Sequence, residues 1–190
     1  MQEVRWRGAS ARMLTGRASE YKLLWVGHHT GFGGVGIFVA EKWIEQIIDV
    51  KRIDDRLMMI KILVGKHAVA IVSAYAPQQG LDDAVKDQFY LKLTQLVSKL
   101  EESDTVIIAG DLNGHVGKMA QGYEGIHGGC GYGVRNLEGE RILELCSALD
   151  LFVANTFFEK QDSHLSTYTS GGCSTQIDYV LMRSNDKKLV

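Results

Sequence analysis

Short runs of apolar, often β-branched residues recur through the first 75 positions of the chain and predict a succession of strands. The runs expected to be strands are residues 21–26, 35–40, a segment that begins at 47–50, 57–64 and 67–75. The last two flank Gly65 and Lys66, so they are expected to form a hairpin. Pro77, the only proline, follows the last run and is expected to end that strand, because proline lacks the N–H that a strand ladder needs.

The apolar spacing changes to a helical period after the proline. Spacings of three and four predict a helix over residues 80–102, whose apolar stripe consists of Val85, Phe89, Leu93, Leu96 and Leu100. The elements expected to follow are a buried strand over 105–109, a glycine-rich loop over 114–136, a second helix over 137–149, and strands at 151–154, near Tyr168 and at 177–182. Because strands mostly follow one another in hairpin order with two clear helices among them, the pattern favours a mixed α/β layered sandwich over a doubly wound parallel sheet.

The composition fits an ordinary globular protein. The length of 190 residues suits one domain, and 45% apolar with 23% charged residues is a usual balance. The net charge of −2 lacks the basic signature of a pure DNA-binding module, but it does not exclude an enzyme that holds phosphate through a metal ion. Cys130, Cys146 and Cys173 form no C-x-x-C pair, so we expect neither a disulfide framework nor a zinc site. Without an apolar run long enough for a membrane span or a signal peptide, the sequence predicts an intracellular protein, with the nucleus as one compartment it could occupy.

The segment from Thr105 to Gly114 carries the strongest candidate chemistry. A buried strand ends in Gly110 and is followed by Asp111 and, two residues on, by Asn113. In an extended chain these two side chains would project to the same side. A carboxylate can accept a proton from water and an amide can bind a phosphate oxygen, a pairing that suits phosphodiester hydrolysis. The alternative is an Asx turn that only ends the strand, and spacing alone does not separate the two interpretations.

Three further residues are weaker candidates. Tyr75 lies at the end of a buried strand before the only proline, where it could face a phosphate or be an ordinary strand-end tyrosine. Asp178 interrupts an apolar strand, so its carboxylate needs a partner, which could be a site residue or a structural ion pair. Glu3 is a hard oxygen donor of the kind that magnesium prefers, although near a terminus it could equally be a solvated side chain.

Two other patterns are set aside. Residues 31–36 match the dinucleotide-binding spacing G-x-G-x-x-G, but a strand rather than a helix is expected to follow, so a turn between strands is the better interpretation. His28 and His29 are adjacent and would face opposite ways in a strand, so we expect turn residues and no metal site there. His115 is expected to line the pocket near Asn113 without acting as a ligand.

Four segments in order resemble the endonuclease/exonuclease/phosphatase superfamily, which includes DNase I, the apurinic/apyrimidinic endonucleases and the endonuclease domains of non-LTR retrotransposons. They are residues 2–3, 73–77, 110–113 and 177–179. Residues 2–8 and 133–141 are most similar to the retrotransposon-type branch. The resemblance implies a DNase I-like, four-layer α/β/β/α sandwich. It also implies a metal-dependent phosphodiester hydrolase that uses Mg²⁺, with Mn²⁺ as the other ion that could serve.

The resemblance also implies a role for each matched residue. Glu3 would be the magnesium ligand, and Tyr75 would contact the scissile phosphate. Asp111 would activate or position the attacking water, and Asn113 would bind and orient the phosphate. Asp178 would pair with the family's active-site histidine.

DNA is the substrate that the resemblance favours, cleaved by an endonuclease of apurinic/apyrimidinic or retrotransposon type. Thr167, just before Tyr168, matches more weakly a threonine that lies near the DNA backbone in the retrotransposon branch.

The chain departs from the family pattern at both ends. Members begin with a strand that carries an asparagine and end with a strand that carries the catalytic histidine, and none of the six histidines matches the latter position. We therefore expect residues 1–190 to form a single domain truncated at both ends and lacking a terminal strand at each. Besides the endonuclease, this leaves two alternatives: a catalytically dead homologue that acts only in binding, and a phosphatase or sphingomyelinase-like member of the same superfamily.

Overall fold

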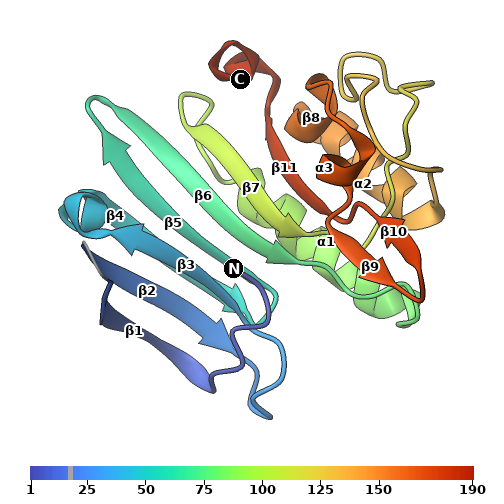
Figure 1. Ribbon diagram of the computed structural model, residues 1–190. Coiled ribbons are helices and arrows are strands. Elements are labelled where there is room, and N and C mark those ends of the chain that lie inside the picture. Colours follow the sequence, from blue (N-terminus) through green and yellow to red (C-terminus); the bar gives the residue numbers. More distant parts are fainter. Residues whose placement is uncertain (17–18) are drawn as a thin grey trace. The chain divides into compact units, whose positions relative to one another are not determined.

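A computed structural model describes residues 1–16 and 19–190 of the chain (Figure 1). The contacts divide the chain into two compact units. Unit 1 comprises residues 1–75 and 100–106, and unit 2 comprises residues 76–99 and 107–190. Glu3 and Tyr75 therefore belong to unit 1, whereas Asp111, Asn113 and Asp178 belong to unit 2.

Unit 1 is built from antiparallel strands. One group pairs in the order β1 (Gly8–Thr15), β2 (Glu20–Gly27) and β3 (Val35–Ala40), and a second in the order β4 (Ile47–Asp54), β5 (Leu57–Val64) and β6 (His67–Tyr75). The short 3-10 helix η1 (Glu41–Gln46) connects β3 to β4. The β5–β6 register runs from Leu57 opposite Ala74 to Val64 opposite His67, which confirms the predicted hairpin.

The two strand groups of unit 1 pack face to face. Their shared apolar core takes residues from both groups: Leu24, Val35, Ile37, Val39, Met58, Ile60, Ile62 and Tyr75. Alternation along β2 sends Leu24 into this core and sends Leu23 and Trp25 to the opposite face, where Val4 packs on them. The N-terminal segment that carries Glu3 is thus anchored on a buried strand.

Unit 2 combines an antiparallel group of strands with helices. The strands pair in the order β7, β11 (Asp178–Arg183) and β8 (Leu151–Val153), and β7 (Thr105–Asp111) contributes its last five residues to this unit. The hairpin of β9 (Tyr168–Ser170) and β10 (Cys173–Thr175) precedes β11. Helices α1 (Asp83–Val97), α2 (Leu137–Ala148) and α3 (Asp162–Leu165) and the 3-10 helices η2 (Ala154–Phe157) and η3 (Ser184–Leu189) complete unit 2.

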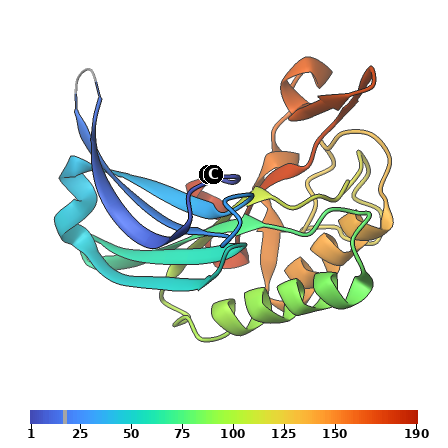
Figure 2. The ribbon, with the colours of Figure 1, turned by 90° about the horizontal axis from the view of Figure 1, so that it is seen from below.

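Helices α1 and α2 lie side by side (Figure 2). Phe89 and Leu93 of α1 are buried, as are Ile142 and Leu143 of α2. The buried Lys86 on α1 donates from Nζ to Glu138 Oε1 on α2 at 3.0 Å. This ion pair fixes the first turn of α2, which directly follows the long loop of residues 112–136.

Several predicted elements need correction. Helix α1 is shorter than expected, because Asp104 Oδ2 accepts from the Glu101 N–H and from Lys61 Nζ, which holds residues 101–104 in a turn. Its buried stripe includes Lys86, whereas Val85 is exposed. Strand β1 was not predicted, because its small and polar residues are almost all exposed and show no alternation. Of the described residues, no helix combines the length and apolarity needed to cross a membrane.

Candidate functional site

Two acidic residues are paired where β7 ends and β11 begins. Asp111 is the last residue of β7 and Asp178 the first of β11, and the antiparallel register places them directly opposite each other. Opposite residues of an antiparallel pair project from the same face, with Cβ atoms roughly 5 Å apart. Both residues are half-buried. The register therefore brings two acidic side chains to the same end of the strand pair.

Asp111 and Asn113 form a tight turn. The Asn113 N–H donates to Asp111 Oδ1 at 2.9 Å, so the pair is an Asx turn, and Asn113 itself has the left-handed φ of 49°. Asn113 Nδ2 donates to the Ala76 carbonyl at 2.8 Å, and the Ala76 N–H donates to the Asp111 carbonyl at 2.8 Å. The strand alternation expected from the sequence therefore stops at Asp111. An Asx turn is present, and it holds both polar groups in fixed positions.

Thr167 holds the start of β11. Its Oγ1 accepts from the Ile177 N–H at 3.1 Å and from the Asp178 N–H at 3.2 Å. Across the strand pair, the Leu112 N–H donates to the Ile177 carbonyl at 2.8 Å. Thr167 is exposed. In this arrangement its hydroxyl positions the backbone of Asp178 next to Asp111.

Glu3 and Tyr75 meet in unit 1. The Tyr75 hydroxyl donates to Glu3 Oε1 at 3.2 Å, across 72 positions of sequence. Arg5 donates from Nη2 to the other carboxylate oxygen of Glu3 at 2.8 Å. The Arg5 N–H donates to the Gly33 carbonyl at 2.9 Å, which ties this segment to the loop before β3. Two residues that the sequence marked separately are thus in direct contact.

Glu3 has an unusual backbone conformation and a lowered pKa. Its φ is 51° and that of Arg5 is 57°, a region that residues with a Cβ rarely adopt and that is often found at functional positions. Hydrogen bonds from Arg5 and then from Tyr75 hold the pKa of Glu3 below its ordinary value. Glu3 is therefore a carboxylate, and not a carboxylic acid, across the neutral range.

The donor chemistry of Glu3 fits a magnesium ion. Mg²⁺ binds one or two carboxylates and keeps several water molecules, and the Glu3 side chain is 47% exposed, which leaves room for water. Arg5 competes with a cation for the same carboxylate. Within residues 1–16 and 19–190, no cluster of three or more His, Cys, Asp or Glu side chains is placed to hold a metal. An ion at Glu3 would depend on that carboxylate and on water.

In the two units, three residues that contact the candidate residues were missed by sequence reasoning. Arg5 binds Glu3, the Arg56 guanidinium lies 5.3 Å from the centre of the Tyr75 ring, and Ala76 contributes both backbone groups to the Asp111–Asn113 turn. Arg56 also donates to the Tyr75 carbonyl at 3.3 Å. Only the position of Ala76 beside Pro77 gave a signal, because contacts of Arg5 and Arg56 depend on long-range folding.

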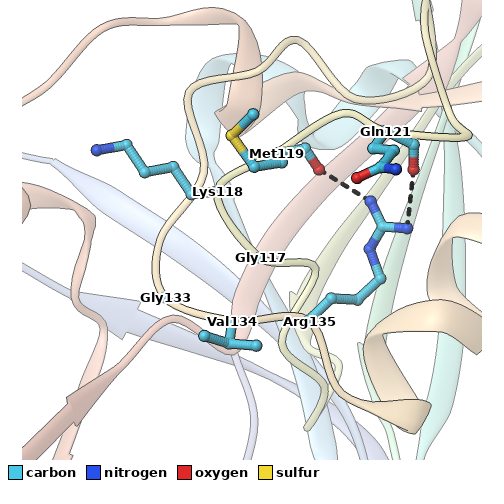
Figure 3. A pocket seen from close by; sticks show the side chains of 7 residues that line it. All are labelled: Gly117, Lys118, Met119, Gln121, Gly133, Val134 and Arg135. Carbon is cyan, nitrogen blue, oxygen red and sulfur yellow. Dashed lines mark hydrogen bonds between the residues drawn. The ribbon is translucent and has the colours of Figure 1, made fainter.

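The glycine-rich loop after Asn113 is held by side chains and contains a shallow cavity (Figure 3). Arg135 donates to the carbonyls of Met119 at 2.9 Å and Gln121 at 3.1 Å. The cavity has a volume of about 470 Å³. It is lined by Gly117, Lys118, Met119, Gln121, Gly133, Val134 and Arg135. His115 is not among its lining residues, so the expected placement of His115 in a pocket is not met at this cavity.

The chain has a curated relative in sequence. No family model matches it. It is 30% identical over 152 residues to craniofacial development protein 2 of Bos taurus, an alignment that covers 79% of this chain. The chain spans about a quarter of the length of that protein, since the alignment covers 25% of it.

Solved structures share the fold at low sequence identity. The endonuclease domain of TRAS1, a telomere-specific non-LTR retrotransposon, matches 97% of this chain and 71% of its own length, with a TM-score of 0.59 and 13% identity. The 3′ phosphatase NExo from Neisseria, bound to a product DNA hairpin, matches 88% of this chain and 68% of its own length, with a TM-score of 0.62 and 13% identity. An endonuclease/exonuclease/phosphatase family protein from Leptotrichia buccalis matches 87% of this chain and 61% of its own length, with a TM-score of 0.54 and 15% identity. The fold is therefore mixed α/β and DNase I-like, as the resemblance implied, and the four-layer arrangement stays a prediction.

Proposed function

We propose that this chain hydrolyses phosphodiester bonds in DNA with the help of a divalent metal ion. The observation that carries the proposal is the register of β7 and β11, which sets Asp111 directly opposite Asp178 at the strand ends. Structural neighbours that include a retrotransposon endonuclease and a 3′ phosphatase support the general kind of reaction.

In unit 2, Asp111 would accept a proton from the attacking water as that water adds to phosphorus and the bond to the leaving oxygen breaks. Asp178, held at its backbone by Thr167, would add a second carboxylate beside Asp111. Asn113 would orient a phosphate oxygen, because its backbone is fixed in the Asx turn and its side chain is held at Ala76. Thr167 is exposed and would lie near the DNA backbone.

In unit 1, Glu3 would hold the metal ion and the Tyr75 hydroxyl would donate to a phosphate oxygen. Mg²⁺, or Mn²⁺ in its place, would supply neutralisation of the negative charge that develops on the phosphate. Arg5 would move its guanidinium from Glu3 to a phosphate oxygen when the ion binds, since arginine binds both groups in the same geometry.

DNA is the proposed substrate because two of the structural neighbours are connected with it by name. One is the endonuclease domain of a telomere-specific retrotransposon and the other was solved with a product DNA hairpin. We infer that the protein acts inside the cell, with the nucleus as one site of action.

Nicking of supercoiled plasmid DNA tests the proposal. The wild-type chain is expected to convert plasmid to the open-circular form in Mg²⁺ and to leave it intact in a chelator. Asp111→Ala is expected to lower the nicking rate by about 10²- to 10⁴-fold, the usual contribution of a general base. Glu3→Gln should raise the Mg²⁺ concentration that gives half-maximal rate. Glu102→Ala, which removes an exposed carboxylate outside the candidate site, is the matched control and should nick as the wild type does.

Plasmid nicking, together with assays on two other substrates, separates the alternatives. A folded wild-type chain that binds plasmid but never nicks it would favour the binding-only homologue, in which Arg5 keeps Glu3 neutralised. Release of phosphate from a 3′-phosphorylated oligonucleotide without internal cleavage would favour a phosphatase. Hydrolysis of sphingomyelin with no action on DNA would favour the sphingomyelinase-like alternative.

A further inference from the structure

Asn136 holds the backbone just beyond the Asp111–Asn113 turn. Its Oδ1 accepts from the His115 N–H at 2.9 Å and from the Gly139 N–H at 2.8 Å. Its own N–H donates to the His115 carbonyl at 3.1 Å. One residue therefore binds both backbone groups of His115, which lies 21 positions earlier, and also caps helix α2.

The backbone of the first turn of α2 is also in close contact with the backbone of Gly114 and His115. A Cβ at Gly139 would lie 1.7 Å from the His115 carbonyl oxygen, and a Cβ at Gly114 would lie 2.7 Å from the Glu138 carbonyl carbon. Neither glycine has a positive φ, so the close approach, and not an unusual dihedral, is what requires glycine at both positions. Helix α2 is itself fixed by the buried Lys86–Glu138 ion pair.

The turn between these contacts needs support from outside. Asn113 has a left-handed φ of 49°, which is costly for a residue with a Cβ and persists where neighbouring structure enforces it. On one side, Ala76 binds the Asp111 carbonyl and the Asn113 side chain. On the other side, only Gly114 separates Asn113 from His115, and Asn136 binds the N–H and the carbonyl of His115.

We propose that Asn136 is a positioning residue for the hydrolytic site, acting through His115 and Gly114 to set the geometry of Asp111 and Asn113. The proposal rests on the proposed function, since it assigns Asn136 to the same reaction. Asn136 does not touch the substrate. Its contribution is the placement of the water-activating carboxylate and the phosphate-orienting amide, and a displacement of about 1 Å in such groups can cost about 10²-fold in rate.

A role restricted to helix capping is the competing explanation, and two substitutions separate it from positioning. Asn136→Ser keeps a capping oxygen for the Gly139 N–H but is too short to reach the His115 N–H as well. Asn136→Asp keeps an acceptor at the position of Oδ1 and can serve both. Ile142→Val is the matched control, because it weakens the buried face of the same helix without touching His115.

Steady-state nicking of DNA in Mg²⁺ provides the first readout. Asn136→Ser is expected to lower kcat by about 10- to 10²-fold with little change in KM, whereas Asn136→Asp should restore most of the rate. Ile142→Val should lower the melting temperature and leave kcat near the wild-type value. The proposal is overturned if Asn136→Ser nicks as fast as the wild type, or if Ile142→Val loses as much kcat at an equal loss of melting temperature.

Amide hydrogen exchange, read residue by residue by NMR, keeps the test independent of activity. In Asn136→Ser the amides of His115 and Asn113 should exchange faster, while in Asn136→Asp and Ile142→Val the Asn113 amide should exchange at the wild-type rate. If the wild-type chain shows no nicking, the proposed function fails, yet this measurement still tests whether Asn136 fixes the backbone of His115 and Asn113. Unchanged exchange at Asn113 in Asn136→Ser contradicts the positioning role whatever the activity.

Discussion

Glu3 carries two hydrogen bonds on one carboxylate and a backbone conformation that glutamate seldom adopts. Arg5 binds Oε2 and Tyr75 binds Oε1, so both oxygens are engaged in unit 1. The N-terminal segment around Glu3 is anchored by Val4 in an apolar cluster and by the Arg5 N–H at Gly33. These contacts explain how a side chain only two residues from Met1 keeps a fixed position.

Removal of Arg5 should change the titration of Glu3. The pKa of Glu3 lies below its ordinary value chiefly because of Arg5 and next because of Tyr75. Arg5→Ala is therefore expected to raise that pKa toward the ordinary value, and Tyr75→Phe to raise it by a smaller amount. Titration of the Glu3 side-chain carboxyl carbon by NMR measures both shifts. An unchanged pKa in Arg5→Ala would mean that the 2.8 Å ion pair does not persist in solution.

The candidate residues were predictable one by one, and their contacts were not. Residue type and the end of an apolar run mark Asp111, Asn113 and Tyr75 in the sequence. The opposition of Asp178 to Asp111 depends on the register of two strands 67 positions apart (178 − 111), which no local pattern specifies. The left-handed backbone of Asn113 likewise depends on its distant contact with Ala76.

At the scale of elements, the long loop of residues 112–136 is organised by a buried histidine. His127 is 1% exposed. Its Nδ1 accepts from the Gly129 N–H at 2.9 Å, which leaves Nε2 to donate to the Gly117 carbonyl at 3.0 Å. The neighbouring Ile126 carbonyl accepts from the Val153 N–H at 2.9 Å, which ties the loop to β8. The ring must be neutral in this arrangement, because protonated Nδ1 would face another N–H.

Acid should therefore weaken the fold through His127. Burial holds the pKa of His127 below its ordinary value of 6.5 in the folded chain. Between the two values the unfolded chain binds more protons, so stability rises with pH and is lost as pH falls from about 6.5 through the folded-state pKa. Melting temperatures measured from pH 7.5 to pH 5 should fall for the wild type.

A variant without the titrating ring gives the control. His127→Gln keeps a donor for the Gly117 carbonyl but removes the buried ring. Its melting temperature should be lower than that of the wild type at pH 7.5 and should fall less on acidification. His164→Gln removes an exposed histidine and should follow the wild-type profile. Equal pH dependence in the wild type and His127→Gln would show that other groups cause the acid loss.

The apolar pattern predicted most elements because most of them contain several buried residues. β2, β3, β5, β6 and α2 lie within a few residues of the expected ranges, since each strand contains a run of buried residues and burial recurs along the helix. β1 and β10 have almost no buried residues and hence no pattern to detect. The end of α1 was misjudged because a side chain from outside the helix, Asp104, stops it.

At the scale of the whole molecule, fold and activity rest on different observations. A solved structure that matches 97% of the chain supports the fold. Because the two sequences are only 13% identical, this likeness says nothing about the substrate or the reaction rate of this chain. The curated relative shares 30% of residues, but the chain spans a quarter of that protein. The expectation of a single domain stays a prediction, and hydrolysis must be judged from the chemistry of this chain.

Cleavage of an end-labelled DNA duplex in ¹⁸O-enriched water tests the central claim most directly. If a water activated at Asp111 attacks phosphorus, each cleavage in Mg²⁺ places one ¹⁸O atom in the new terminal phosphate, which mass spectrometry detects. Asp111→Asn, which keeps the size of the side chain and removes its basicity, is expected to slow cleavage and ¹⁸O incorporation by about 10²- to 10⁴-fold. Undiminished ¹⁸O incorporation by Asp111→Asn, or a folded wild-type chain that incorporates none, would contradict the account.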